Sequence, residues 1–171
     1  MQFYKVAARL LDYPDAELMK NLDAVTQLVN SDLEVTTEEK QVVNELVSWM
    51  QSLDLTRIQQ TYVDTFDMTP EHDLHLTHHL FGESRERGPA MVEISEHYKA
   101  AGLEVSNGEL PDFLPLILEY VSTLDEMQAR FFLNDAAKVL TVLADNLDKV
   151  DSLYGRLIRV IEKRGYLAKA A

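Results

Sequence analysis

The sequence contains no cysteine, which excludes disulfide bonds and any metal site built from thiolates. Glycine and proline are scarce, with six and five residues, so the turns that a β-sandwich needs are missing. Basic residues are also few: 16 lysines and arginines stand against 29 aspartates and glutamates, and the net charge is −13. Because nucleic acids and anionic membrane surfaces attract basic proteins, neither is expected as a partner.

Long uncharged stretches are absent as well. No segment approaches the roughly 18 apolar residues of a transmembrane helix, so we expect no direct membrane insertion. The N-terminal stretch MQFYKVAARLLDYPD differs from a signal peptide, because Asp12 interrupts its apolar run early and no small-residue cleavage site follows. Together with the lack of cysteine, these absences predict a cytoplasmic protein.

Apolar residues, in contrast, are plentiful and recur with a period of about 3.6 residues, the pattern of amphipathic helices. Thr36 and Glu39 have the spacing of a capping box at the start of the third predicted helix. Tyr13-Pro14 ends the first helix. The apolar faces of the first four predicted helices span 3–11, 18–29, 42–53 and 55–66.

The helical pattern breaks between residues 68 and 78 and then resumes. Gly82 is suited to close a short turn, and Gly88-Pro89 is typical of a helix start, because proline fits the first helical turn. That helix is expected to end at Gly102. The following helix, 114–121, has almost no polar face, so we place it in the centre of the fold, with Asp112 in its first turn.

Two further helices are predicted at 131–150 and 153–161. The sequence shows no repeat and no convincing strand. The fold class expected is therefore all-α: a single domain over residues 1–171, a bundle of about seven or eight helices. The basic, alanine-rich end, residues 165–171, is expected to fray.

Four histidines, His72, His75, His78 and His79, gather in the irregular segment. A metal site needs three or four convergent ligands, and helical di-iron sites repeat Glu-x-x-His, which this chain lacks. We expect a polar loop whose histidines cap helix ends, with no metal and no cofactor. A metal- or cofactor-binding bundle that uses the His72–His79 cluster is the alternative.

Catalytic motifs are missing from the sequence. It has no Gly-x-Ser-x-Gly nucleophile turn, no P-loop and no dinucleotide-binding fingerprint. Paired carboxylates are plentiful, but most such pairs in an acidic chain are solvated. We therefore expect no catalytic residues and no enzymatic turnover.

The stretch HHLFGESRERG places Arg85 and Arg87 among glutamates, between Gly82 and Gly88. Both arginines can form structural ion pairs with the chain's many carboxylates, and such pairs order a loop when they are partly buried. We interpret these four residues as a structural loop that fixes the connection between two helices.

Three stretches occur in a characteristic order: YVDTFD (62–67), HLFGESRERGPAMVE (79–93) and ELPDFLPLILEY (109–120). Together with ARLLDYPD (8–15), they resemble the nitrate reductase molybdenum cofactor assembly chaperones of the NarJ type. That family belongs to a wider group of redox-enzyme maturation chaperones that includes the TorD and DmsD types. The similarity covers roughly residues 3–165.

The resemblance implies an all-α chaperone that binds the N-terminal leader of the catalytic alpha subunit of a membrane-bound nitrate reductase. It also implies that the chaperone holds the apoenzyme for molybdenum cofactor insertion before membrane attachment. The wider group usually has histidine after the aspartate of its Glu-x-Pro-Asp-like motif. Here that position is Phe113, so a titratable imidazole is missing there.

The stretches that carry the resemblance also suggest where the leader binds. Two of them, 62–67 and 109–120, place carboxylates beside aromatic or aliphatic side chains, an arrangement that fits an amphipathic basic helix in a groove. The expected peptide-binding residues are Tyr62, Asp64, Phe66, Asp67, Asp112, Phe113, Glu119 and Tyr120.

Overall fold

The computed structural model describes residues 1–106 and 108–166. Within these residues the chain forms ten α-helices, a π-helical turn and a 3₁₀ turn, which confirms the all-α prediction. In chain order they are α1 Gln2–Leu11, α2 Ala16–Lys20, α3 Leu22–Ser31, α4 Thr37–Gln51, α5 Leu55–Tyr62, η1 Val63–Asp67, η2 Pro70–His72, α6 Leu76–Phe81, α7 Arg87–Ala100, α8 Leu114–Thr123, α9 Glu126–Asp148 and α10 Leu153–Tyr166. None of the described helices is both long and apolar enough to cross a bilayer.

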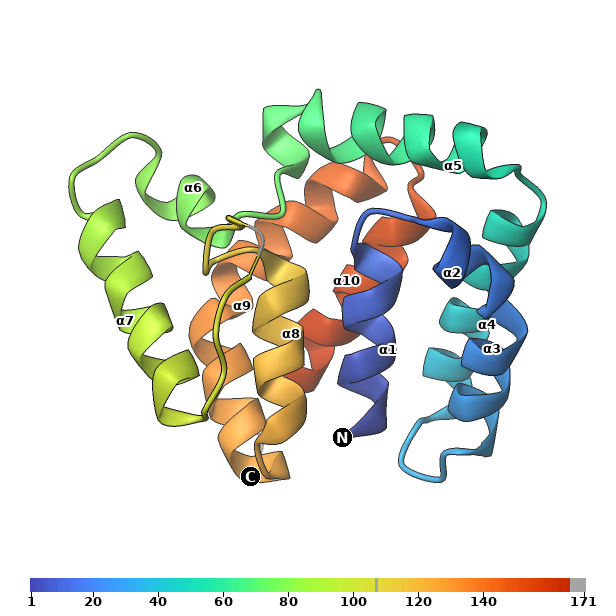
Figure 1. Ribbon diagram of the computed structural model, residues 1–171, viewed down its shortest axis with the longest axis horizontal. Helices are drawn as coiled ribbons and strands as arrows, with labels where there is room; N and C mark the ends of the chain where they lie inside the picture. The colour runs from blue at the N-terminus through green and yellow to red at the C-terminus, as the bar shows by residue number, and fades with distance from the viewer. Residues whose placement is uncertain (107, 167–171) are drawn as a thin grey trace.

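The centre of the molecule is a layer made of α1, α8, α9 and α10 (Figure 1). α9 and α10 form the most extensive helix pair, and α1 packs against α8. Leu114, Leu118 and Val121 of α8 are fully buried, as expected for a helix without a polar face. α3 and α4 lie on one side of this layer, and α6 and α7 lie on the opposite side.

Side-chain caps start several helices where the sequence indicates them. Thr36 Oγ1 accepts from the Glu39 amide at 3.2 Å, and the Glu39 carboxylate accepts from the Thr36 amide at 2.9 Å, which confirms the capping box. Asp125 and Gln128 form a second box at the start of α9. Because of this second box, α9 begins at Glu126, five residues before the predicted apolar face.

Three helices differ from the sequence prediction. The predicted second helix is divided at Asn21 into α2 and α3. The fourth covers its predicted span, but beyond Tyr62 it has the form of a π-helical turn, η1. α10 continues to Tyr166, so the helix enters the segment expected to fray, and Gly165 is buried; residues 167–171 lie outside the described part. Packing against neighbouring helices, which local sequence does not report, explains the extension of α10.

Close approach of α9 and α10 gives a test of this packing. A Cβ atom on Gly155 would lie 2.7 Å from Leu147 Cβ, closer than carbon atoms pack. Gly155→Ala is therefore expected to lower the free energy of unfolding by about 1–3 kcal/mol, measured by urea denaturation. Gly88→Ala is the control, because a Cβ there meets open space and alanine favours helix by up to about 1 kcal/mol. Equal stability of the two variants would contradict the close approach.

Candidate functional site

The two glycines of the GESRERG stretch have different roles. Gly82 ends α6 with φ of 55°, a left-handed conformation that favours glycine, as the turn prediction requires. Gly88 lies inside the first turn of α7 instead of in a turn between helices, so that part of the interpretation is wrong. α7 begins one residue earlier, at Arg87, because the Ser84 carbonyl accepts from the Arg87 amide at 3.1 Å.

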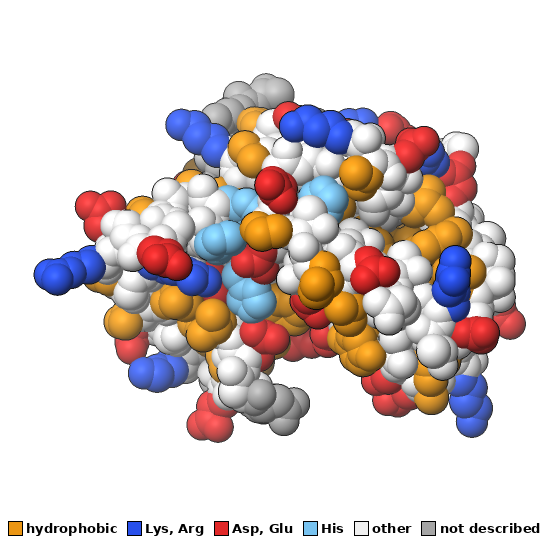
Figure 2. Space-filling view, turned by 90° about the horizontal axis from the view of Figure 1, so that it is seen from above, with side chains coloured by type: hydrophobic (Ala, Val, Ile, Leu, Met, Phe, Trp, Pro, Cys, Tyr) orange, Lys and Arg blue, Asp and Glu red, His pale blue; other side chains and the backbone are white. Residues whose placement is uncertain are grey.

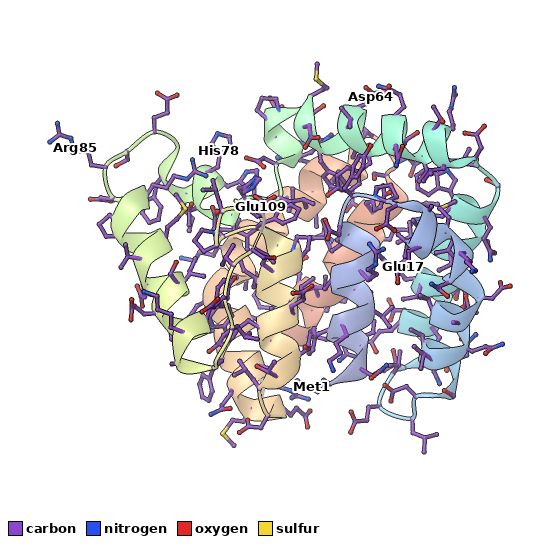
Figure 3. The ribbon with its side chains drawn as sticks, in the orientation of Figure 1. Met1, Glu17, Asp64, His78, Arg85 and Glu109 are labelled. Atoms are coloured by element: carbon purple, nitrogen blue, oxygen red, sulfur yellow. The ribbon has the colours of Figure 1, made fainter. Side chains whose placement is uncertain are left out.

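The two arginines also differ. Arg85 is exposed and projects from the loop (Figure 3), and within the described part of the chain it forms no ion pair, contrary to expectation. Arg87 turns inward: its Nε donates to Thr77 Oγ1 at 2.9 Å, and its Nη2 lies 3.6 Å from Asp112 Oδ2. The predicted anchoring of the loop to an acid is therefore carried by Arg87 alone.

Arg87 anchors the loop to Asp112, whose side chain is fully buried. Its Oδ2 accepts from the Thr77 amide at 3.0 Å and from the Thr77 hydroxyl at 2.5 Å. The sequence prediction placed Asp112 in the first turn of α8 and at the peptide surface. Both placements are wrong, because α8 begins at Leu114 and the carboxylate points into the interior. Asp112 instead joins the two most characteristic sequence stretches to each other.

A second polar contact lies beside this one and centres on His75. His75 Nδ1 lies 2.7 Å from Asp73 Oδ1, and Nε2 lies 2.8 Å from Glu109 Oε1. The hydrogen bond with Asp73 raises the pKa of His75 most, burial opposes the rise and the bond with Glu109 adds to it, so the pKa reaches about 9. His75 is therefore protonated at neutral pH and links two carboxylates across the fold.

Phe113, at the position where the wider group has histidine, stacks on the His75 ring with a centroid distance of 5.1 Å. The backbones of these two residues also form an antiparallel bridge, flanked by Leu114 N donating to Leu74 O at 2.9 Å. Phe113 is half-buried, so it supports the protonated imidazole from one face.

The other histidines of the cluster are engaged by protein acceptors. His72 Nδ1 lies 2.9 Å from Thr65 O and its Nε2 3.3 Å from Asn146 O. His79 Nε2 lies 2.6 Å from Asp73 O. Figure 2 shows the histidines gathered on one face, next to carboxylates and hydrophobic side chains. Among the described residues, no group of three or more His, Cys, Asp or Glu side chains is arranged to hold a metal ion.

The expected peptide-binding residues divide into two groups. Tyr62, Phe66 and Tyr120 are core aromatics, and the Tyr62 hydroxyl donates to Leu11 O at 2.9 Å. Tyr62 and Phe66, together with the buried Asp112, are inaccessible to a ligand, whereas Tyr120 lines a hollow among α6, α7, α8 and α9. The residues that reach the surface are Asp64, Asp67, Phe113 and Glu119.

We call Asp12, Asp67, Glu109 and Glu119 the acidic surface. Burial raises the pKa of Tyr62, and the charges of Asp12, Asp67 and Glu109 add to the rise, so these three carboxylates lie near its ring. Burial raises the pKa of Glu119, and the charge of Asp12 adds to the rise. Burial also raises the pKa of Asp12, and the charge of Glu109 contributes in the same direction. Sequence reasoning missed Asp12, although it directly follows the first apolar run in the LDYPD stretch.

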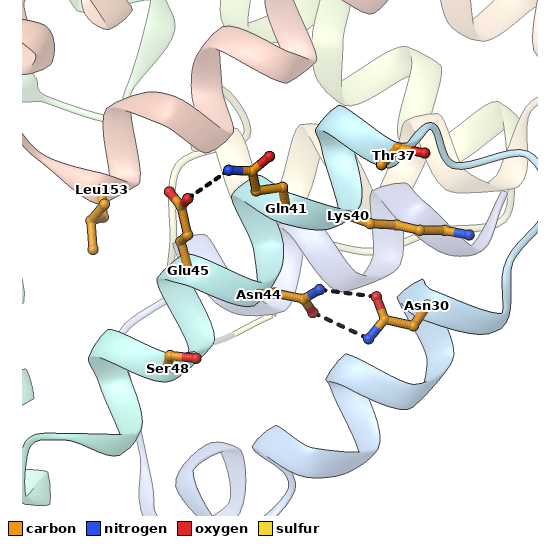
Figure 4. A pocket seen from close by; sticks show the side chains of 8 residues that line it. All are labelled: Asn30, Thr37, Lys40, Gln41, Asn44, Glu45, Ser48 and Leu153. Atoms are coloured by element: carbon orange, nitrogen blue, oxygen red, sulfur yellow. Dashed lines mark hydrogen bonds between the residues drawn. The ribbon is translucent and has the colours of Figure 1, made fainter.

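The surface also contains hollows. One lies between α3 and α4, beside Leu153 of α10 (Figure 4), and most of the residues that line it are of polar type: Asn30 and Asn44 bond reciprocally at 3.3 and 3.1 Å, and Gln41 donates to Glu45. These side chains satisfy each other, so the hollow offers little to a ligand. Another, of about 640 Å³, lies among α6, α7, α8 and α9 and is mainly apolar.

The fold places the chain in an all-helical class that is also seen in a crystal structure from Archaeoglobus fulgidus, whose title describes a redox enzyme maturation protein. The TM-score is 0.65, with 20% identity, over 95% of this chain and 91% of that one. Residues 32–158 match the model of the nitrate reductase delta subunit family. The chain belongs to this family, which confirms the resemblance seen in the sequence.

Curated relatives agree with this assignment. The chain is 32% identical to "Nitrate reductase molybdenum cofactor assembly chaperone NarJ" of Escherichia coli K12, over 92% of this chain and 67% of the relative. It is 29% identical to "Probable nitrate reductase molybdenum cofactor assembly chaperone NarJ" of Bacillus subtilis 168, over 89% of this chain and 82% of the relative.

The His75 contact predicts a pH dependence of stability. The pKa of His75 in the folded protein, about 9, lies above its ordinary value of about 6.5. The contact therefore contributes its full stabilisation of the folded state below pH 6.5, and this contribution is lost as the pH rises through 9. Between pH 6 and pH 10, the stability advantage of the wild type over His75→Gln should shrink by about 1–2 kcal/mol, measured by urea denaturation. Parallel curves for the two proteins would contradict the assignment.

The buried Asp112 predicts a large effect of its removal. Asp112→Ala removes the carboxylate that faces the Thr77 amide and the Arg87 guanidinium. The free energy of unfolding should therefore fall by about 3–5 kcal/mol. Asp112→Asn keeps one acceptor oxygen and should cost about half of that. Asp64→Ala is the exposed control, expected within about 0.5 kcal/mol of the wild type. A loss in Asp112→Ala no larger than in the control would refute the network.

Proposed function

We propose that this protein is an assembly chaperone of a nitrate reductase. It binds the N-terminal leader of the catalytic alpha subunit and holds the apoenzyme for molybdenum cofactor insertion before the enzyme attaches to the membrane. The cofactor is cargo for the client, and the chaperone acts in the cytoplasm without catalytic turnover.

The observation that carries this proposal is family membership over most of the chain. The family model covers residues 32–158, and the E. coli relative, which is named as such a chaperone, matches 92% of this chain. The net charge of −13 supports a basic leader as ligand, because opposite charge accelerates encounter and favours the correct partner.

We place the basic residues of the leader on the acidic surface. Its carboxylates come from the residue after α1, from η1, from α8 and from the segment before α8, so it gathers charge from distant parts of the chain. Tyr13, 45% exposed, and Leu110, 40% exposed, add apolar contacts nearby. Tyr13 lies edge-on to Tyr62, with centroids 5.6 Å apart, so the buried Tyr62 supports the surface from behind.

Co-purification tests the function directly. The tagged protein, co-expressed with the complete alpha subunit, is expected to capture it, and capture should fall strongly when the N-terminal segment of the alpha subunit is deleted. Mass spectrometry identifies the captured subunit, and its molybdenum content reports whether capture precedes cofactor insertion. Equal capture with and without the N-terminal segment would refute leader binding.

Charge reversal tests the surface. Asp67→Lys and Glu119→Lys should each weaken the binding of a synthetic leader peptide roughly fivefold, measured by calorimetric titration, because each replaces an attraction with a repulsion. Binding should also weaken above about 0.1 M salt, where the Debye length is near 10 Å. Glu34→Lys is the matched control, an exposed acid in the loop before α4. Unchanged affinity in both surface variants would place the leader elsewhere.

A further inference from the structure

A third hollow, of about 600 Å³, lies where α5 and η1 meet the turn between α9 and α10. We call it the Trp49 hollow; its lining includes Trp49, Asp64, Thr65, Asp151 and Tyr154. Figure 1 shows α5 along one edge of the molecule. Sites for small molecules commonly have this volume. The Trp49 hollow shares no residue with the acidic surface or with the apolar hollow among α6, α7, α8 and α9.

One wall of the Trp49 hollow is the π-helical turn η1, which carries Asp64 and Thr65. The Thr69 hydroxyl donates to Asp64 O at 3.0 Å, and His72 Nδ1 lies 2.9 Å from Thr65 O. Thr69 and His72 line the hollow as well, so side chains at its surface hold the backbone of this turn in place. π-helical turns are rare and occur frequently at functional sites.

Trp49 is the single tryptophan of the chain. Its ring meets Tyr154 edge-on, with centroids 5.6 Å apart and planes at 88°, so packing fixes its position. The side chain is only partly buried, which leaves part of it open to the hollow. Among aromatic side chains, tryptophan attracts cations most strongly, because the face of its ring carries negative charge.

The charge at the Trp49 hollow is negative. Two carboxylates, Asp64 and Asp151, line it, and no lysine or arginine is among the described residues of the lining. Both aspartates are exposed, and in the described part of the chain neither forms an ion pair. Gln60 donates to one oxygen of Asp64 at 2.9 Å, so the other oxygen is open to a ligand. A ligand that carries positive charge is therefore favoured at this site.

A buried polar atom beside the hollow lacks a partner. Tyr154 is 1% exposed, and its hydroxyl forms no hydrogen bond with any described residue. Burial raises the pKa of Tyr154, so the hydroxyl stays protonated and neutral. An unsatisfied buried hydroxyl costs roughly 1–3 kcal/mol. Because Tyr154 lines the hollow, a ligand N–H that reaches this oxygen would supply the missing hydrogen bond.

These features fit an organic cation better than a metal ion or an anion. A calcium or magnesium ion takes about six or more oxygen ligands. No group of three or more His, Cys, Asp or Glu side chains among residues 1–106 and 108–166 is arranged to hold a metal ion. An anion would be repelled by both aspartates. An aliphatic amine instead offers methylene groups to Val150 and Leu153, and ammonium groups to the carboxylates.

We propose that the Trp49 hollow binds a small aliphatic diamine or polyamine. Its ammonium groups pair with Asp64 and Asp151, and Trp49 attracts them through the face of its ring. Two carboxylates favour a ligand with more than one positive charge over a monoamine of the same length, because each charge adds its own attraction. This site is independent of the proposed function, because it involves neither the acidic surface nor the client.

Trp49 itself reports the binding. The chain has no other tryptophan, so a change in tryptophan fluorescence during a titration of the complete protein arises at this hollow. 1,4-Diaminobutane and spermidine should each produce a saturable change. n-Butylamine should bind at least about threefold more weakly, because it carries one charge. 1,4-Butanediol, which is uncharged and has the same chain length, should produce no saturable change.

Two conservative variants locate the site. Asp64→Asn keeps the acceptor for Gln60, and Asp151→Asn keeps a residue that tolerates the positive φ of 57° at this position. Each should weaken the binding of 1,4-diaminobutane about fivefold, while circular dichroism shows an unchanged helical spectrum. Glu71→Gln is the matched control. It removes the same charge from an exposed acid on η2 that does not line the hollow, so the affinity should stay unchanged.

The absence of a saturable response to either amine in the wild type overturns the site, and so does an equal affinity of the aspartate variants and Glu71→Gln. Equal affinity for n-butylamine and 1,4-diaminobutane overturns the pairing with two carboxylates. A response to magnesium or calcium ions at the same concentrations, with none to the amines, identifies a metal site and overturns the organic cation.

Discussion

The arrangement of α6, α7 and α8 depends on one buried carboxylate. Asp112 is fully removed from solvent, and a buried polar side chain is costly unless donors reach it. Thr77 supplies two of these donors, and Arg87 adds a positive charge at 3.6 Å. The backbone reinforces the same junction, because Leu76 N donates to Asp112 O at 3.1 Å. The positions of three helices are therefore coupled through a single side chain.

This junction lies between the acidic surface and the apolar hollow among α6, α7, α8 and α9. On one side, His75 bonds to Glu109 of the acidic surface. On the other side, Thr77 belongs both to the Asp112 network and to the lining of the hollow. The same few contacts therefore hold the residues that border both features.

Helical periodicity predicted the all-α fold and the central position of α8, and the spacing of Thr36 and Glu39 predicted the capping box. All three features depend on residues that are close in sequence. The burial of Asp112 was not predictable in this way. An aspartate before a helix resembles an ordinary cap, and its donor Thr77 is 35 residues away. The exposure of Phe131 was not predictable either. Its position in the helical pattern of α9 indicates a core residue, but in the folded protein no helix covers its side chain.

The pairing of α1 with α8 has a consequence for folding during synthesis of the chain. α1 is complete at Leu11, but the helix that covers its apolar face begins at Leu114. During synthesis at roughly 5–20 residues per second, about 5–20 s separate the two helices. Throughout that interval α1 lacks its packing against α8, although α3, which also contacts α1, is already made.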